Sequence, residues 1–138
     1  MSKRIFSFLG LVALMVLMSG VLTAAAPMPV TTFTLVQGLP STMNVGDTYM
    51  VVVRVDSDQP FVFAQALPAA YYPGRGVTAA QGDHAGAGTS ALLSVPFYAR
   101  TSTADFADGK APVSLSVGVR YGGGYNVVQR YDFFVTVP

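Results

Sequence analysis

The chain has 138 residues, with eight Lys and Arg, seven acidic residues, one His and no Cys. This length suits one domain with its own core, and the lack of Cys excludes a disulfide framework and a thiolate metal site. The charges are not clustered, which argues against nucleic acid as a partner, and the scarcity of Glu and Lys beside abundant Val, Thr, Tyr and Phe favours strands over helices.

Residues 1–25 have the pattern of a secretory signal peptide. Lys3 and Arg4 form a basic start, an apolar run follows, and small residues surround the predicted cleavage point after Ala25. We therefore expect export to the cell envelope or the extracellular space, with 26–31 as a short linker. The alternative is an uncleaved anchor, because the apolar stretch 5–26 is long enough to span a bilayer. This segment would then be the only contact with the membrane.

Residues 32–138 are predicted to form one all-β domain. Alternating hydrophobic residues predict strands at 32–36, 48–55, 61–66, 77–81 and 90–100. Pro96 cannot donate a hydrogen bond to a neighbouring strand, so the strand that contains it is expected at a sheet edge or at a bulge. Residues typical of turns predict loops at 56–60, 67–76 and 82–88.

The stretch from Pro112 to Val137 has the pattern of a long β-hairpin that reverses at Gly122–Gly124. A three-residue loop keeps the apolar residues of both arms on one face, whereas a two-residue loop would turn one set to solvent. The predicted opposite pairs are Tyr121 with Tyr125, Val119 with Val127, Leu115 with Tyr131 and Val113 with Phe133. Gln129 is the one polar residue on the apolar side, and it predicts a bulge or a buried hydrogen bond.

The stretch Met43–Val55 combines a hydrophobic residue, a Gly46-Asp47 turn and an alternating strand. It resembles the entry to the second strand of many secreted prokaryotic immunoglobulin-like domains. Together with about seven strands at regular intervals, it predicts an antiparallel, immunoglobulin-like β-sandwich. The resemblance concerns architecture and carries no functional residue over, and the Cys-Trp-Cys core of antibody domains is absent.

The sequence offers little for catalysis. His84 is the only histidine, and it lies in a Gly- and Ala-rich stretch where we expect it to be exposed to solvent. It has no companions for a zinc or copper site and no motif of a Ser-His-Asp device, so we expect neither an enzyme nor a cofactor. Two aspartate pairs, Asp56 with Asp58 and Asp105 with Asp108, are weak candidates for calcium, because Asp in turns usually bonds its own backbone.

Tyr71, Tyr72 and Arg75 form the candidate binding patch. Two adjacent tyrosines in a loop rich in Pro and Gly cannot both point into a core, so at least one is expected to be exposed. Exposed aromatic residues beside an Arg favour contact with a protein or a glycan. The alternative is that one tyrosine caps the end of the sandwich and hydrogen-bonds the backbone.

These observations predict a non-catalytic domain that acts in binding or adhesion to a protein or glycan at the cell surface. One alternative is a structural subunit of a surface fibre or layer, in which residues 32–36 pair with the edge of a neighbour. Another is a protease inhibitor that presents a loop, although the chain contains no motif of such inhibitors.

Overall fold

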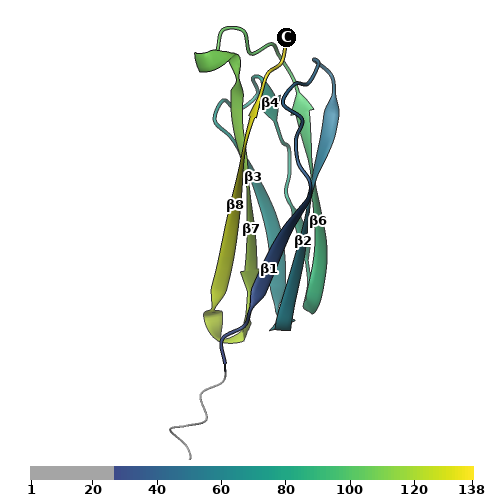
Figure 1. Ribbon diagram of the computed structural model, residues 1–138, viewed down its shortest axis with the longest axis vertical. Coiled ribbons are helices and arrows are strands. Elements are labelled where there is room, and N and C mark those ends of the chain that lie inside the picture. Colours follow the sequence, from purple (N-terminus) through teal and green to yellow (C-terminus); the bar gives the residue numbers. More distant parts are fainter. Residues whose placement is uncertain (1–26) are drawn as a thin grey trace, which may run out of the picture.

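The computed structural model describes residues 27–138 as two antiparallel sheets of four strands that pack face to face (Figure 1). One sheet has the order β1-β2-β6-β4 and the other the order β5-β3-β7-β8. The strands are β1 (Thr31–Gln37), β2 (Thr48–Phe61), β3 (Phe63–Ala70), β4 (Val77–Thr78), β5 (Asp83–Ala85), β6 (Gly88–Ala99), β7 (Ala111–Arg120) and β8 (Asn126–Val135). Two short 3-10 turns, η1 (Ala107–Gly109) and η2 (Gly122–Gly124), flank β7. The predicted all-β sandwich is confirmed, whereas the predicted signal segment 1–25 lies outside the described residues.

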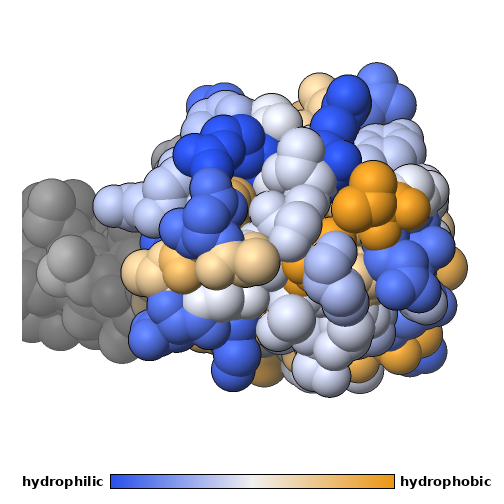
Figure 2. All heavy atoms as spheres, turned by 90° about the horizontal axis from the view of Figure 1, so that it is seen from above, coloured by the Kyte–Doolittle hydropathy of each residue, from blue (hydrophilic) through white to orange (hydrophobic). Residues whose placement is uncertain are grey.

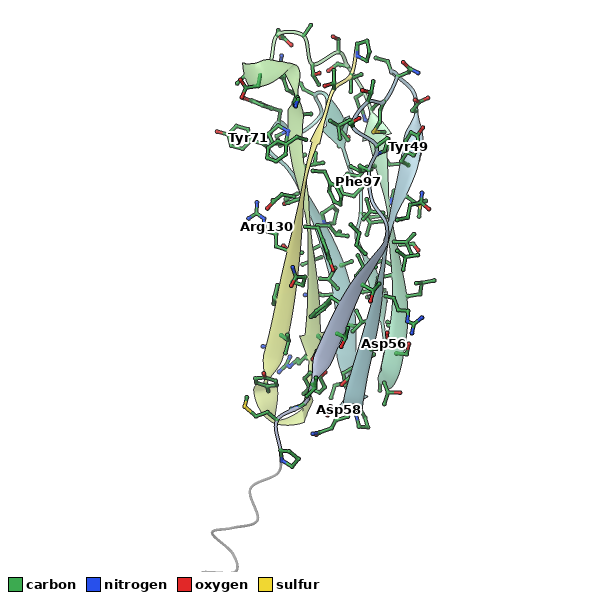
Figure 3. The ribbon with its side chains drawn as sticks, in the orientation of Figure 1. Tyr49, Asp56, Asp58, Tyr71, Phe97 and Arg130 are labelled. Carbon is green, nitrogen blue, oxygen red and sulfur yellow. The ribbon has the colours of Figure 1, made fainter. Side chains whose placement is uncertain are left out.

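The core lies between the sheets and comes from alternate residues of the long strands. In β2, Val51, Val53 and Val55 are fully buried, as the alternation predicted. Figure 3 shows Phe97 of β6 in this interior, where it is also fully buried. Each such side chain stabilises the fold by about 1.5–3 kcal/mol relative to an exposed position. Within residues 27–138, no helix has the length and apolar character needed to cross a membrane.

β2 passes directly into β3, although the two strands belong to different sheets. The loop predicted at 56–60 is wrong, because the chain before β1 continues to pair with β2 there. The N–H group of Asp58 donates to the carbonyl of Val30 at 3.2 Å, which holds these turn-type residues extended. The chain then bends at Val62, whose N–H group donates to the carbonyl of Arg120 in the other sheet at 2.8 Å.

The first part of the loop predicted at 67–76 is also wrong, because β3 continues through Pro68. Successive N–H groups of a strand point to opposite sides. Tyr71 donates its N–H group to the carbonyl of Pro112 on β7 at 3.2 Å, so the nitrogen of Pro68 points away from β7. On that side β5 pairs with β3 only as far as Ala66, so the missing N–H group of Pro68 removes no hydrogen bond from the sheet.

Two smaller expectations are also corrected. The short strand β5 lies within the loop predicted at 82–88, where it pairs with β3. β6 is not an edge strand, because it lies between β2 and β4. Its neighbour β4 reaches only Tyr98 and Ala99, however, so among the described residues no strand pairs with β6 beside Pro96 on that side. The proline therefore occupies a locally open edge.

The predicted hairpin register is confirmed. β7 pairs with β8 without a shift, and the pairs include Val119 with Val127 and Val113 with Phe133. The bulge or buried hydrogen bond predicted at Gln129 is wrong, because this residue pairs regularly and is exposed. β8 is the outermost strand of its sheet, so a polar side chain on its inner side still reaches water.

The segment after β1 crosses to the other sheet. The N–H group of Met43 donates to the carbonyl of Thr136 at 3.0 Å, and the N–H group of Thr136 donates to the carbonyl of Ser41 at 2.9 Å. This parallel bridge joins the open sides of the two sheets at one end of the sandwich.

Candidate binding surface

The outer face of the β5-β3-β7-β8 sheet has a trough along β7. The inward residues of β7 are buried hydrophobic side chains, whereas four successive outward residues are small: Pro112, Ser114, Ser116 and Gly118. Larger side chains of β3 and β8 flank them, because the register places Gln65 and Val128 opposite Gly118. A row of small residues between larger ones produces a shallow depression.

One end of this trough is aromatic. A recess of about 340 Å³ is lined by Tyr71, Pro112 and Phe134 together with Ser114, Arg130 and Asp132. A second recess of about 490 Å³ uses the same three residues with Asp108 and Lys110. The side chains of Tyr71 and Phe134 are 73% and 61% exposed. We call Tyr71, Pro112 and Phe134 the aromatic recess.

Buried neighbours hold Tyr71 in place. Its ring meets that of Tyr72 edge to face, with 4.8 Å between centroids, and Tyr72 lies 4.5 Å from the ring of Phe106. Phe106 is buried, and Tyr72 is half-buried against the core. The exposed ring is therefore the outermost member of a stack that begins inside the sandwich.

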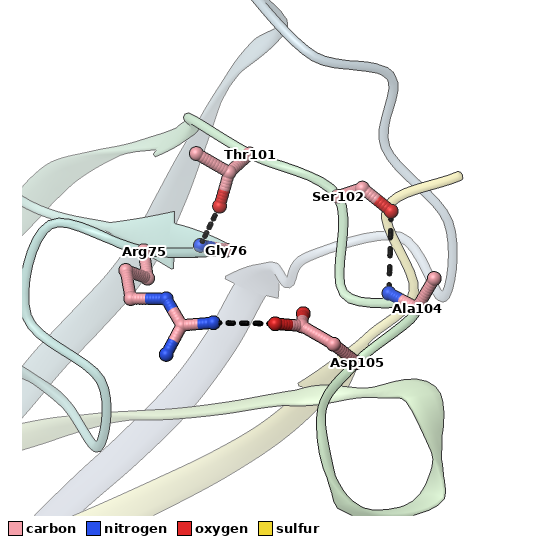
Figure 4. A network of polar contacts seen from close by, with 6 residues as sticks. All are labelled: Arg75, Gly76, Thr101, Ser102, Ala104 and Asp105. Carbon is pink, nitrogen blue, oxygen red and sulfur yellow. Dashed lines mark hydrogen bonds and ion pairs between the residues drawn. The ribbon is translucent and has the colours of Figure 1, made fainter.

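Arg75 stabilises the other side of this stack. Its guanidinium donates to the carboxylate of Asp105 at 2.6 Å (Figure 4) and lies 5.1 Å from the centre of the Phe106 ring. Beside it, the N–H group of Gly76 donates to the hydroxyl oxygen of Thr101 at 2.8 Å. Arg75 lines neither side of the aromatic recess. These contacts tie the loop that carries Arg75 to the segment around Phe106.

The structure thus places the three predicted patch residues in one loop with different surroundings. Tyr71 is exposed, Tyr72 packs on the core, and Arg75 is in an ion pair. Sequence reasoning missed Phe134 as a site residue. The sequence contained the information needed to place it, because the alternation of the hairpin that points Phe133 inward puts Phe134 on the outer face.

Figure 2 shows the sandwich from the end at which β8 runs out, and hydrophobic residues there form separate spots between hydrophilic ones. At the opposite end a recess of about 420 Å³ is lined by Pro27, Met28, Tyr121 and Tyr125 among others. Figure 3 shows Tyr71 and Arg130 on the outer side of the sheet that contains β8, and Tyr49 on the opposite side of the sandwich. The exposed aromatic pair therefore belongs to a flank of the molecule.

The four aspartates considered for calcium do not come together. Asp56 pairs with Arg54 at 2.8 Å, and Asp58 accepts the N–H group of Val30 at 2.8 Å. Both lie at the end of the sandwich away from Tyr71 (Figure 3), whereas Asp105 pairs with Arg75. Asp108 lies in η1 with a φ of 58°. In the part of the chain from Pro27 onward, no three His, Cys, Asp or Glu side chains gather in a metal-binding group.

His84 is exposed on β5, where its ring stacks on that of Phe63 at 5.9 Å. The neighbouring Asp83 carboxylate accepts the N–H groups of His84 and Ser94, both at 2.9 Å. The second bond ties β5 to the open side of β6. These contacts give Asp83 a structural role.

Comparison of the chain with protein-family models and with curated proteins found no match.

Proposed function

We propose that this protein is a non-catalytic, immunoglobulin-like binding domain of the cell envelope or cell surface, and that the aromatic recess binds a glycan. The observation that carries the proposal is the pair of exposed rings, Tyr71 and Phe134, on either side of Pro112. The apolar stretch and small residues of 1–25 support export.

The strand order supports the immunoglobulin-like assignment. In constant-type domains the first, second, fifth and fourth strands form one sheet, and the third, sixth and seventh form the other. With β5 set apart as an additional edge strand, the orders β1-β2-β6-β4 and β3-β7-β8 follow this arrangement. The resemblance of Met43–Val55 to the second strand of such domains agrees with the place of β2.

The chemistry of the recess favours a glycan. The C–H face of a sugar ring packs on an aromatic ring, and its hydroxyl groups need donors and acceptors around that ring. Ser114, Arg130 and Asp132 supply both kinds of group beside the aromatic pair. The stack behind Tyr71 fixes this ring before binding, which lowers the entropy cost of contact. The recess is shallow and open, as suits a chain that passes across a surface.

The test is binding of the purified protein to immobilised glycans and to cells that display them. Tyr71→Ala and Phe134→Ala should each remove most of the binding while the melting temperature changes little, because both side chains are largely exposed. Tyr49→Ala is the matched control, since Tyr49 is an exposed tyrosine of the other sheet. Unchanged glycan binding by both recess variants would overturn the proposal, and binding to deglycosylated protein alone would identify a protein ligand.

A further inference from the structure

The free edge of β8 is a regular pairing surface. This strand has ten residues, and its ladder with β7 has no register shift. Tyr121 donates its N–H group to the carbonyl of Tyr125, so odd-numbered residues of β8 direct their backbone groups to β7. Even-numbered residues direct theirs to the free side, as Thr136 does toward Ser41 and Met43.

The other sheet edges of the described chain are shorter or interrupted. β1 has a register shift between Leu35 and Gln37. β4 has two residues and β5 has three. The open side of β6 is interrupted by Pro96 and by the bond from the N–H group of Ser94 to the Asp83 carboxylate. Short strands and bulges protect an edge from pairing, and β8 has neither form of protection.

The side chains along this edge suit antiparallel pairing with an identical strand. The even-numbered residues read Val128, Arg130, Asp132, Phe134, so an antiparallel copy presents Phe, Asp, Arg and Val in turn. We propose that β8 pairs with β8 of a second copy of the chain, antiparallel and about a two-fold axis at Tyr131. Arg130 then faces Asp132 of the second copy, and Val128 faces Phe134 of the second copy, each twice.

The charges select this register over its neighbours. An axis at Arg130 would set two arginines opposite each other, and an axis at Asp132 would set two aspartates opposite each other. Like charges directly opposite destabilise a pairing, whereas opposite charges and aromatic–aliphatic pairs stabilise it. An axis at Gln129 would set Arg130 opposite Val128, and an axis at Phe133 would set Asp132 opposite Phe134. Both charge pairs are lost in either register.

The backbone agrees with the same register. The residues that face each other across the axis, Arg130 with Asp132 and Val128 with Phe134, all have even numbers, so their N–H and C=O groups point to the partner. The pairing ends before Thr136, whose backbone groups already bond Ser41 and Met43. Tyr131 meets its own copy at the axis on the inner side, where its half-buried ring gains further cover.

Such a dimer is closed, because a two-fold pairing uses the same surface on both copies and leaves no unpaired β8 edge for a third copy. The two four-stranded sheets become one, with both aromatic recesses on its outer face. The pairing does not depend on a ligand, but it shares Phe134, Arg130 and Asp132 with the lining of the recess. Tyr71 lines the recess and takes no part in the pairing, so the Tyr71→Ala variant distinguishes a failure of glycan binding from a failure of pairing. The pairing also differs from fibre growth through residues 32–36, which would give open polymers.

The mass of the full chain, expressed with its N-terminal segment so that native processing acts on it, tests the pairing by light scattering after gel filtration. The unchanged protein should be a dimer. Arg130→Asp and Asp132→Arg should each raise the dissociation constant at least about tenfold, because each sets like charges opposite each other. The double variant that exchanges the two charges should dimerise again. A mixture of the two single variants should form a mixed dimer. Circular dichroism confirms that each variant is folded.

A cysteine scan fixes the register, since the chain has no cysteine of its own. Opposite residues that share no backbone bond have Cα atoms about 4.5 Å apart, which suits a disulfide. Tyr131→Cys should therefore form a disulfide-linked dimer under mild oxidation, whereas Gln129→Cys should not, because each such cysteine faces position 133 of the other copy. A monomeric unchanged protein, charge variants that remain dimeric, or equal cross-linking at both positions would overturn the proposal.

Discussion

Two glycines of one loop give a sharp test of how the aromatic recess is supported. Gly74 and Gly76 both have positive φ, at 77° and 63°. A Cβ atom on Gly74 meets nothing within 4 Å, whereas one on Gly76 would lie 2.8 Å from the ring of Phe106 and 3.0 Å from Ala111. Both alanine variants therefore incur backbone strain, and only Gly76→Ala also collides with the buried base of the Tyr71 stack.

The magnitudes separate the two effects. Left-handed backbone costs an alanine about 1–2 kcal/mol, and the smaller entropy of the unfolded chain returns about 0.4–1 kcal/mol. Gly74→Ala should thus lower the free energy of unfolding by at most about 1.6 kcal/mol. Overpacking adds about 1–3 kcal/mol for Gly76→Ala, which is a further fall in melting temperature of about 4–12 °C. Calorimetry measures both variants, and equal melting temperatures would refute the contact between this loop and Phe106.

Three further predictions concern the hairpin, β8 and the stack. Val117→Asp should lower the free energy of unfolding in urea by about 3 kcal/mol or more because Val117 is fully buried, and Ser116→Asp by less than about 1 kcal/mol; equal losses would contradict the register. Burial raises the pKa of Tyr131 above its ordinary value of 10.0. The stability that Tyr131 contributes is thus present in full below about pH 10 and is lost as pH rises through the higher pKa of the folded state. Thermal melts at rising alkaline pH test this, and a Tyr131→Phe variant that loses as much stability as the unchanged protein would disprove it. Tyr72→Ala should lower the melting temperature where Tyr71→Ala does not, since only Tyr72 packs on the core; equal effects would show that the two rings share one environment.

The hairpin and the buried face of β2 could be predicted because residues close together in the sequence determine them. Strict alternation from Val113 onward fixes which side chains point inward, and three glycines fix the length of the turn. The strand through 56–60 could not be predicted in this way. Its residues favour turns, and they are extended because the chain from Pro27 to Thr31 pairs with them, with Thr31 opposite Ser57 and with bonds between Val30 and Asp58. Pro68 is similar, since its place in β3 depends on where β5 stops.

The candidate site was predictable only in part for the same reason. Tyr71 was identified from its own loop, where an exposed aromatic residue follows from the prolines and glycines nearby. Phe134 lies far along the chain and reaches the same recess only through the combined registers of β3, β7 and β8. The ion pair between Arg75 and Asp105 could not be predicted either, because the two residues are 30 positions apart in the chain. A site assembled from three strands is visible only once their pairing is known.

The charges of β8 favour one particular pairing of this edge, rather than protecting the edge from every pairing. Arg130 and Asp132 bond each other at 2.9 Å with 65% and 53% of their side chains exposed, and an ion pair so exposed contributes little to the stability of one chain. Charges of one sign would discourage every antiparallel pairing of this edge. Opposite charges two residues apart instead discourage registers centred on either charge and favour the one centred between them. The arrangement on β8 therefore permits one closed dimer and opposes open association, and the charge-exchanged double variant tests this distinction directly.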